Sequence, residues 1–120
     1  PFPFLVTARA ENFFTGVPDL ADVIARLQAY QEAGAHVLYA PGLKTMDDIK
    51  TVLSAVDRPI NVLMGPRAGF VPMAELEALG VKRVSMGSAL ANTAYGALVR
   101  AAPACSASSK AAHRARTSPP

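Results

Sequence analysis

The sequence alternates short apolar runs with longer segments in which apolar residues recur every three or four positions. The runs that indicate β-strands are residues 4–8, 36–40, 60–64 and 83–86. Each is followed by a segment with helical spacing: residues 20–30, 46–56, 72–79 and 89–101. Apolar residues at that spacing form one face of an α-helix, whereas short runs that are nearly all apolar are typical of strands buried on both faces. The pattern predicts the order βαβαβαβα.

Signals at the segment ends agree with these helices. Asp19 follows Pro18 and is a suitable N-cap for the first helix. Thr45 and Asp48 have the spacing of a capping box before the second. Gly34 and Gly80 stand where the first and third helices should end, because glycine readily adopts the left-handed conformation that closes a helix.

Alternating strands and helices favour an α/β fold with a parallel sheet, since a parallel crossover takes about a dozen residues. Four βα units are half of a (β/α)₈ TIM barrel, and a complete barrel takes roughly 250 residues, more than the 120 present here. A small, open, doubly wound sheet fits the same pattern. We expect residues 1–101 to form the half TIM barrel and residues 102–120 to form a disordered, basic, low-complexity tail.

The net charge of +3 comes from the end of the chain rather than from its body. Residues 100–120 carry four basic residues and no acidic one, which leaves eight basic and nine acidic residues in the remainder. No basic patch interleaved with aromatic residues stands in that remainder, so we expect no nucleic-acid partner. A nucleic-acid binder that uses the tail alone is the alternative, and its binding would depend steeply on salt.

Cysteine content and hydropathy limit the cellular compartments in which we expect the protein. The single cysteine, Cys105, excludes an intramolecular disulfide framework and a zinc cluster built from cysteines. No apolar stretch reaches the roughly 18 residues of a membrane span, and residues 1–6 do not have the pattern of a signal peptide. We therefore expect a cytoplasmic protein with no membrane partner. The absence of an initiating Met suggests that the chain begins inside a longer one.

Ligands of parallel α/β folds bind beyond the carboxyl ends of the strands. Arg9 comes directly after the first apolar run, where its planar guanidinium could hold a carboxylate or phosphate through two hydrogen bonds. Glu11 could orient Arg9 or hold a metal-bound water. A purely structural Arg–Glu pair at a strand end is the alternative.

The other strand ends offer weaker signals. Arg67, in a loop bracketed by glycines, could bind an anion or lie in a solvated turn. Ser88 could present backbone N–H groups to a phosphate or simply cap the last helix. His36 begins a strand at the opposite end and is expected to be structural. Tyr39 could face either side of the sheet.

Three segments together carry a family resemblance: residues 4–12 (FLVTARAEN), residues 25–42 (ARLQAYQEAGAHVLYAPG) and residues 83–90 (RVSMGSAL). They resemble the carboxy-terminal half of an isocitrate lyase/phosphoenolpyruvate mutase superfamily protein, over about residues 3–101. The resemblance implies that the four βα units are strands five to eight of a TIM barrel, each with its helix. It also implies an enzyme that makes or breaks C–C or C–P bonds beside the carbonyl of 2-oxo acids, with Mg²⁺ stabilising an enolate.

By this resemblance Arg9 and Glu11 are the catalytic candidates, and Arg9, Asn12, Gly65 and Ser88 are the substrate-binding ones. The expected ligand is a small carboxylate, and the residues that bind Mg²⁺ in the family belong to the half of the barrel that this chain does not contain. Pro41 and Gly65 stand where the family's lyases carry a Glu and an Asn, which favours a smaller 2-oxo acid over isocitrate.

Taken together, the sequence predicts a fragment of a Mg²⁺-dependent carbon–carbon lyase that is inactive by itself. The alternative is a non-catalytic α/β module that self-associates, because an open half-barrel leaves two sheet edges unpaired. A homo-oligomer is expected in both cases.

Overall fold

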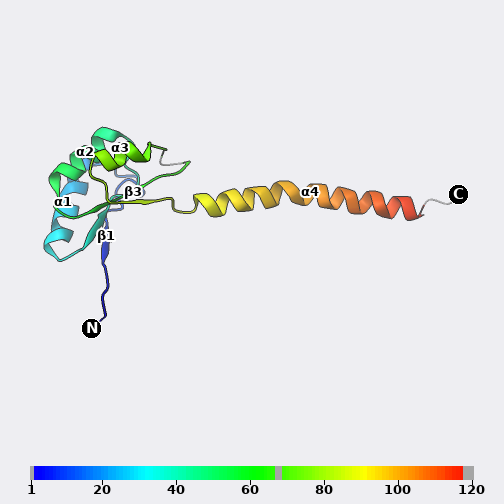
Figure 1. Cartoon of the computed structure of the whole chain (residues 1–120), viewed down its shortest axis with the longest axis horizontal. Coiled ribbons are helices and arrows are strands. Elements are labelled where there is room, and N and C mark those ends of the chain that lie inside the picture. Colours follow the sequence, from blue (N-terminus) through cyan, green and yellow to red (C-terminus); the bar gives the residue numbers. More distant parts are fainter. Residues whose placement is uncertain (1, 67–68, 118–120) are drawn as a thin grey trace. The chain divides into compact units, whose positions relative to one another are not determined.

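The structure is a computed structural model that describes residues 2–66 and 69–117. It divides into two units, Pro1–Gly87 and Ser88–Pro120, which are described separately. The first unit contains four strands and three helices (Figure 1). Their bounds are β1 Thr7–Arg9, α1 Leu20–Glu32, β2 Val37–Tyr39, α2 Met46–Ala55, β3 Ile60–Leu63, α3 Met73–Ala78 and β4 Arg83–Ser85.

The strands form one parallel sheet in the order β1-β2-β3-β4. In a doubly wound sheet the strand order reverses at a switch point, and here it does not. Because βαβ crossovers are right-handed, a sequential order places the connecting helices on one face of the sheet. The prediction of four parallel βα units of a barrel is therefore confirmed, and the doubly wound alternative is wrong.

Side-chain alternation separates the two faces of the sheet. Leu38, Ile60 and Val62 point to the helix-covered face and are buried with residues of the three helices. These helical partners are spaced at three or four residues, as the sequence predicted: Val23 and Leu27 of α1, Ile49 and Val52 of α2, and Leu76 of α3. The core thus lies between the sheet and α1, α2 and α3.

The opposite face, which we call the open face, carries the other residues of each strand. One cross-strand row on it is fixed by the register: Arg9 is paired with Tyr39, Tyr39 with Asn61, and Asn61 with Arg83. This row is polar throughout, in contrast to the apolar face that the helices cover.

The first strand starts later than expected. Pairing with β2 begins at Thr7, whereas the apolar run begins at Phe4, and the side chains of Phe4 and Leu5 are 67% and 71% exposed. The Val6 carbonyl accepts hydrogen bonds from the backbone N–H groups of His36 and Val37, which mark the start of β2. The ladder cannot extend further back because α1 and its closing turn occupy the chain before His36.

The second unit contains α4, Ala89–Thr117. Ser88 precedes the helix, and its carbonyl accepts the first helical hydrogen bond from the Asn92 N–H at 2.8 Å. The helix continues past Ala101, so residues 102–117, expected to form a tail, are helical despite Pro103. Alanine is the commonest residue in that stretch and has the highest helix propensity. Residues 118–120 lie outside the described part of the chain.

Candidate functional site

Arg9 is the last residue of β1, and its guanidinium has two partners in the described chain. Its Nε donates to Glu11 Oε1 at 2.6 Å, and its Cζ lies 4.7 Å from the centroid of the Tyr39 ring. The Arg9 and Glu11 side chains are 49% and 43% exposed, so the pair lies at the surface of the unit. The structure therefore brings the two predicted catalytic residues together, and it places Tyr39 on the open face.

The loop after Arg9 is a compact turn that fixes the position of Glu11. The Glu11 carbonyl accepts from the N–H groups of Phe14 and Thr15 at 2.9 and 3.0 Å. The Asn12 carbonyl accepts from the Val17 N–H at 2.9 Å and from Thr15 Oγ1 at 3.1 Å. These bonds give the backbone between β1 and α1 internal partners, and so help to hold Glu11 near Arg9.

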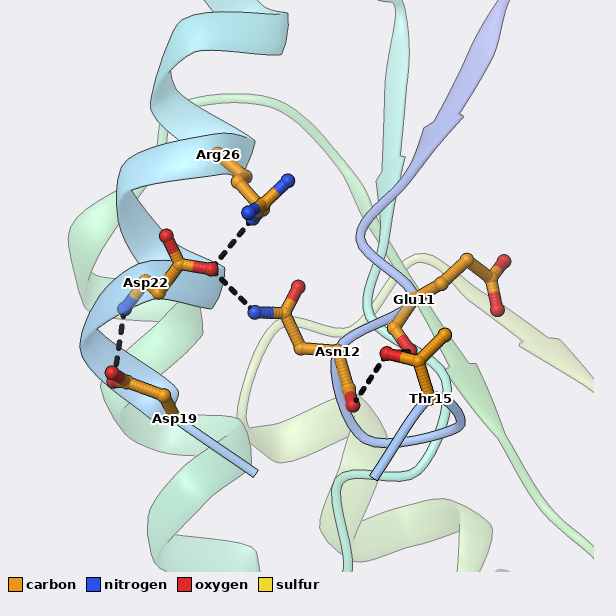
Figure 2. Close-up of polar contacts among 6 residues, drawn as sticks. All are labelled: Glu11, Asn12, Thr15, Asp19, Asp22 and Arg26. Carbon is orange, nitrogen blue, oxygen red and sulfur yellow. Dashed lines mark hydrogen bonds and ion pairs between the residues drawn. The ribbon is translucent and has the colours of Figure 1, made fainter. Parts of the chain in front are cut away.

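Asn12 contacts the start of α1 rather than Arg9. Figure 2 shows its amide pointing to Asp22, with Nδ2 donating to Oδ2 at 2.5 Å, while the Glu11 side chain points the other way. Arg26 Nε donates to the same oxygen at 2.6 Å. The Asn12 residue is only 7% exposed. In this structure its side chain joins the loop to the helix, and its role in binding substrate stays a prediction.

The hydrogen bonds between Asn12, Asp22 and Arg26 shift the pKa values of the two charged residues. The hydrogen bond from Arg26, and then the one from Asn12, hold the pKa of the Asp22 carboxyl below its ordinary value. The same hydrogen bond to Asp22 raises the pKa of the Arg26 guanidinium. Asp22 also lies in the first turn of α1, where its N–H donates to Asp19 Oδ1 at 3.1 Å, which confirms Asp19 as the N-cap.

The loop after β2 packs tightly against the loop after β1. Ala40, Pro41, Gly42 and Leu43 are all buried. Gly42 has φ +98°, and a Cβ placed on it would lie 2.7 Å from Cβ of Phe13. Only glycine allows this approach, so the β2 loop helps to hold the loop that carries Glu11.

The remaining site candidates are not gathered around Arg9 by any described contact. Gly65 exchanges two backbone hydrogen bonds with Gly69, at 3.0 and 2.8 Å, which close the loop after β3. Arg67 lies outside the described residues. Ser88 belongs to the second unit, where its Oγ accepts from Asn92 Nδ2 at 3.1 Å. The roles of Gly65 and Ser88 in substrate binding stay predictions.

The sequence analysis missed a polar cluster on the open face. Asn61 is 1% exposed; its Oδ1 accepts from Arg83 Nη1 at 2.8 Å, and its Nδ2 donates to Ser85 Oγ at 2.9 Å. One signal was available, since Asn61 is the single polar residue in the apolar run 60–64. A buried amide in such a strand needs partners, and alternation places those partners on the same face of β4.

A divalent cation needs several oxygen or nitrogen donors close together. Among residues 2–66 and 69–117, no group of three or more His, Cys, Asp and Glu side chains could hold a metal ion. In the same residues, no helix combines the length and apolar character that a membrane crossing requires.

Comparison with known proteins relates this geometry to a family. Residues 1–105 match the protein family described as phosphoenolpyruvate phosphomutase. A search of curated protein sequences gives no match. Among solved structures, a protein from Burkholderia cenocepacia J2315 assigned as a lyase/mutase is 57% identical, with a TM-score of 0.81 over 86% of this chain.

Two further structures extend the comparison. A protein assigned as a phosphonomutase, also from B. cenocepacia J2315, is 31% identical over 83% of this chain, with a TM-score of 0.72. The structure of 2,3-dimethylmalate lyase is 24% identical over 82% of this chain, also with a TM-score of 0.72, and shows likeness of fold alone.

The chain spans a fraction of each of these proteins: 37% of the lyase/mutase, 42% of the phosphonomutase and 36% of the dimethylmalate lyase. The four parallel βα units therefore correspond to part of a larger barrel protein. The match over residues 1–105 shows that the chain belongs to the phosphoenolpyruvate phosphomutase family.

Proposed function

We propose that this chain supplies the carboxylate-binding strand end of a lyase-type enzyme that acts on small 2-oxo acids. The reaction class is the making or breaking of a C–C or C–P bond beside the carbonyl, through an enolate. The observation that carries the proposal is the Arg9–Glu11 pair at the carboxyl end of β1, held at 2.6 Å.

The geometry supports a defined role for each residue. The Glu11 carboxylate accepts a hydrogen bond from the Nε–H of Arg9, which leaves the two Nη groups of the guanidinium as donors for a ligand. A carboxylate can accept from both of these groups in one plane, and such charge-assisted pairs are stronger than neutral hydrogen bonds. Arg9 binds and orients the substrate carboxylate in this proposal, and Glu11 is the supporting acid that orients Arg9.

If the reaction uses Mg²⁺, the metal ligands would come from outside the described residues. In the described residues the carboxylate beside the anion anchor, that of Glu11, is engaged by Arg9, so we expect no turnover of 2-oxo acids by the 120-residue chain alone, with or without Mg²⁺. Release of pyruvate at an enzymatic rate from the chain alone would contradict this expectation.

The anchor can be tested by titrating the isotope-labelled chain with oxalate and with pyruvate, followed by NMR. We expect saturable binding with shifts at residues 9–12, weakened by Arg9→Gln roughly 10- to 100-fold, because hydrogen bonds to charged groups contribute roughly 1.5–3 kcal/mol. Arg9→Lys should also bind more weakly, since an ammonium cannot form the planar pair. Arg58→Gln removes an exposed arginine at the other end of the sheet and should change nothing. Equal binding by wild type and Arg9→Gln would refute the anchor.

A second candidate function is a non-catalytic module that self-associates. The observation that favours it is the exposure of four apolar side chains, Phe2, Phe4, Leu5 and Val6, immediately before the edge strand β1. Exposed apolar residues beside an unpaired strand edge favour pairing with another chain. Measurement of the mass in solution tests this candidate.

A further inference from the structure

The guanidinium of Arg9 is held on two sides, and Glu11 accounts for only one of them. The second contact is the Tyr39 ring, which lies on the next strand at the paired position of the register. A cation within about 6 Å of an aromatic centroid is attracted by the negative face of the ring. The 4.7 Å between Arg9 Cζ and the ring centroid falls within this range.

Tyr39 itself is rigidly placed. The residue is 8% exposed, and its carbonyl accepts from the Ala10 N–H at 2.9 Å, directly after Arg9. The two backbones are thus joined beside the ring. Arg9, in contrast, has a side chain that is half exposed and carries roughly 2 kcal/mol of rotamer entropy, so without a fixed neighbour it would sample many directions.

We propose that Tyr39 is a positioning residue for Arg9: its ring, together with Glu11, fixes the direction of the guanidinium before a carboxylate arrives. This inference rests on the proposed function for its ligand, whereas the ring contact itself is independent of that function. Pre-orientation strengthens binding because less entropy is lost when the ligand binds. The tyrosine hydroxyl is not required for this role; the aromatic face is.

Variants of Tyr39 can separate the role of its aromatic ring from that of its hydroxyl. Tyr39→Phe keeps the ring and should bind oxalate within about twofold of wild type, while Tyr39→Leu should weaken binding roughly 2- to 30-fold, the range of a cation–π contact. In an Arg9→Gln background, Tyr39→Leu should have no further effect, because the guanidinium that it positions is gone. Val37→Ala changes the same face of the same strand at the position paired with Thr7 rather than with Arg9, and serves as the control.

A second readout separates positioning from stability and from the proposed function. The Arg9 Nε–Hε resonance of the unliganded, folded chain should be shifted by the ring current in wild type and Tyr39→Phe. In Tyr39→Leu it should move toward the position of a free arginine. Circular dichroism confirms that each variant is folded under the conditions used.

The outcomes are distinct. An unchanged Arg9 resonance in folded Tyr39→Leu overturns the inference, as does equal oxalate binding by Tyr39→Leu and wild type. If wild type binds neither oxalate nor pyruvate while the resonance moves as expected, the ring contact is upheld and the proposed carboxylate function fails.

Discussion

At the scale of single residues, the Arg9–Glu11 pair gives orientation rather than stability. Ion pairs between half-exposed side chains typically contribute roughly 0–1 kcal/mol to the free energy of unfolding. Glu11→Gln should therefore leave the unfolding midpoint in urea nearly unchanged, a shift corresponding to less than about 1 kcal/mol. A larger loss would show that the pair is structural, which is the alternative that the sequence left open.

Gly42 is the residue on which the loop packing depends most. Gly42→Ala places a Cβ 2.7 Å from Phe13 Cβ and also forces a side chain into the left-handed region. Gly34→Ala is the matched control, because Gly34 has a similar φ of +95° but nothing within 4 Å of the added Cβ. Strained backbone of this kind costs roughly 1–3 kcal/mol. Urea unfolding should show a greater loss for Gly42→Ala than for Gly34→Ala, and equal losses would mean that the loop contact is unimportant.

At the scale of elements, the contact of Asn12 and Arg26 with Asp22 ties the β1–α1 loop to α1. Because these partners hold the folded pKa of Asp22 below its ordinary value of 3.8, the ionised carboxylate stabilises the fold at neutral pH. That contribution is fully present above pH 3.8 and disappears as the pH falls through the lower folded pKa. Asp22→Asn should accordingly be less stable than wild type at pH 7, and the difference should shrink below the ordinary pKa.

Asp47→Asn provides the control for this pH dependence. Asp47 also lies in the first turn of a helix, so it interacts with the helix dipole as Asp22 does, and its partner is Lys50 at 3.6 Å. Thermal unfolding of both variants and wild type between pH 7 and pH 2 measures the comparison. A stability difference for Asp22→Asn that persists unchanged at the lowest pH would contradict the role of its charge.

The elements also show what the sequence could predict. The apolar spacing of Val23 and Leu27 and the cap at Asp19 are local signals, and the structure has α1 where they predict it. The start of β1 and the end of α4 were misplaced. A strand exists only where a neighbour pairs with it, and the neighbour of β1 begins at Val37. The sheet order was not fixed by local pattern at all, because it depends on contacts between distant strands.

In the site, as in the fold, local contacts could be predicted from the sequence and contacts between distant residues could not. Arg9 and Glu11 stand two residues apart, so their pairing needed only the end of a strand. The faces on which Tyr39 and Asn61 lie could not be assigned, because the face of a strand residue follows from register rather than from its own neighbours. Asn12 has a partner ten residues away, a distance along the chain at which spacing alone gives no contact.

At the scale of the whole molecule, the sheet of the first unit ends in two outer strands. β1 and β4 each pair with one neighbour within the described residues. The open face between them carries a buried amide and two guanidinium groups. An apolar partner sheet would remove these guanidinium groups from water without offering them new partners, so contact between copies of the chain is expected at the strand edges and not across this face.

The exposed edge of β1 therefore predicts that copies of the chain associate. Light scattering after size-exclusion chromatography should give a mass that rises with protein concentration, because Phe4 and Leu5 expose apolar surface beside unpaired backbone groups. Leu5→Lys should lower this association, since an edge lysine opposes pairing with a second strand. Val17→Lys is the control: Val17 is 56% exposed but lies in the turn before α1, away from the edge. A mass that stays at one chain at all concentrations would refute edge pairing and leave the carboxylate-binding role as the function to test.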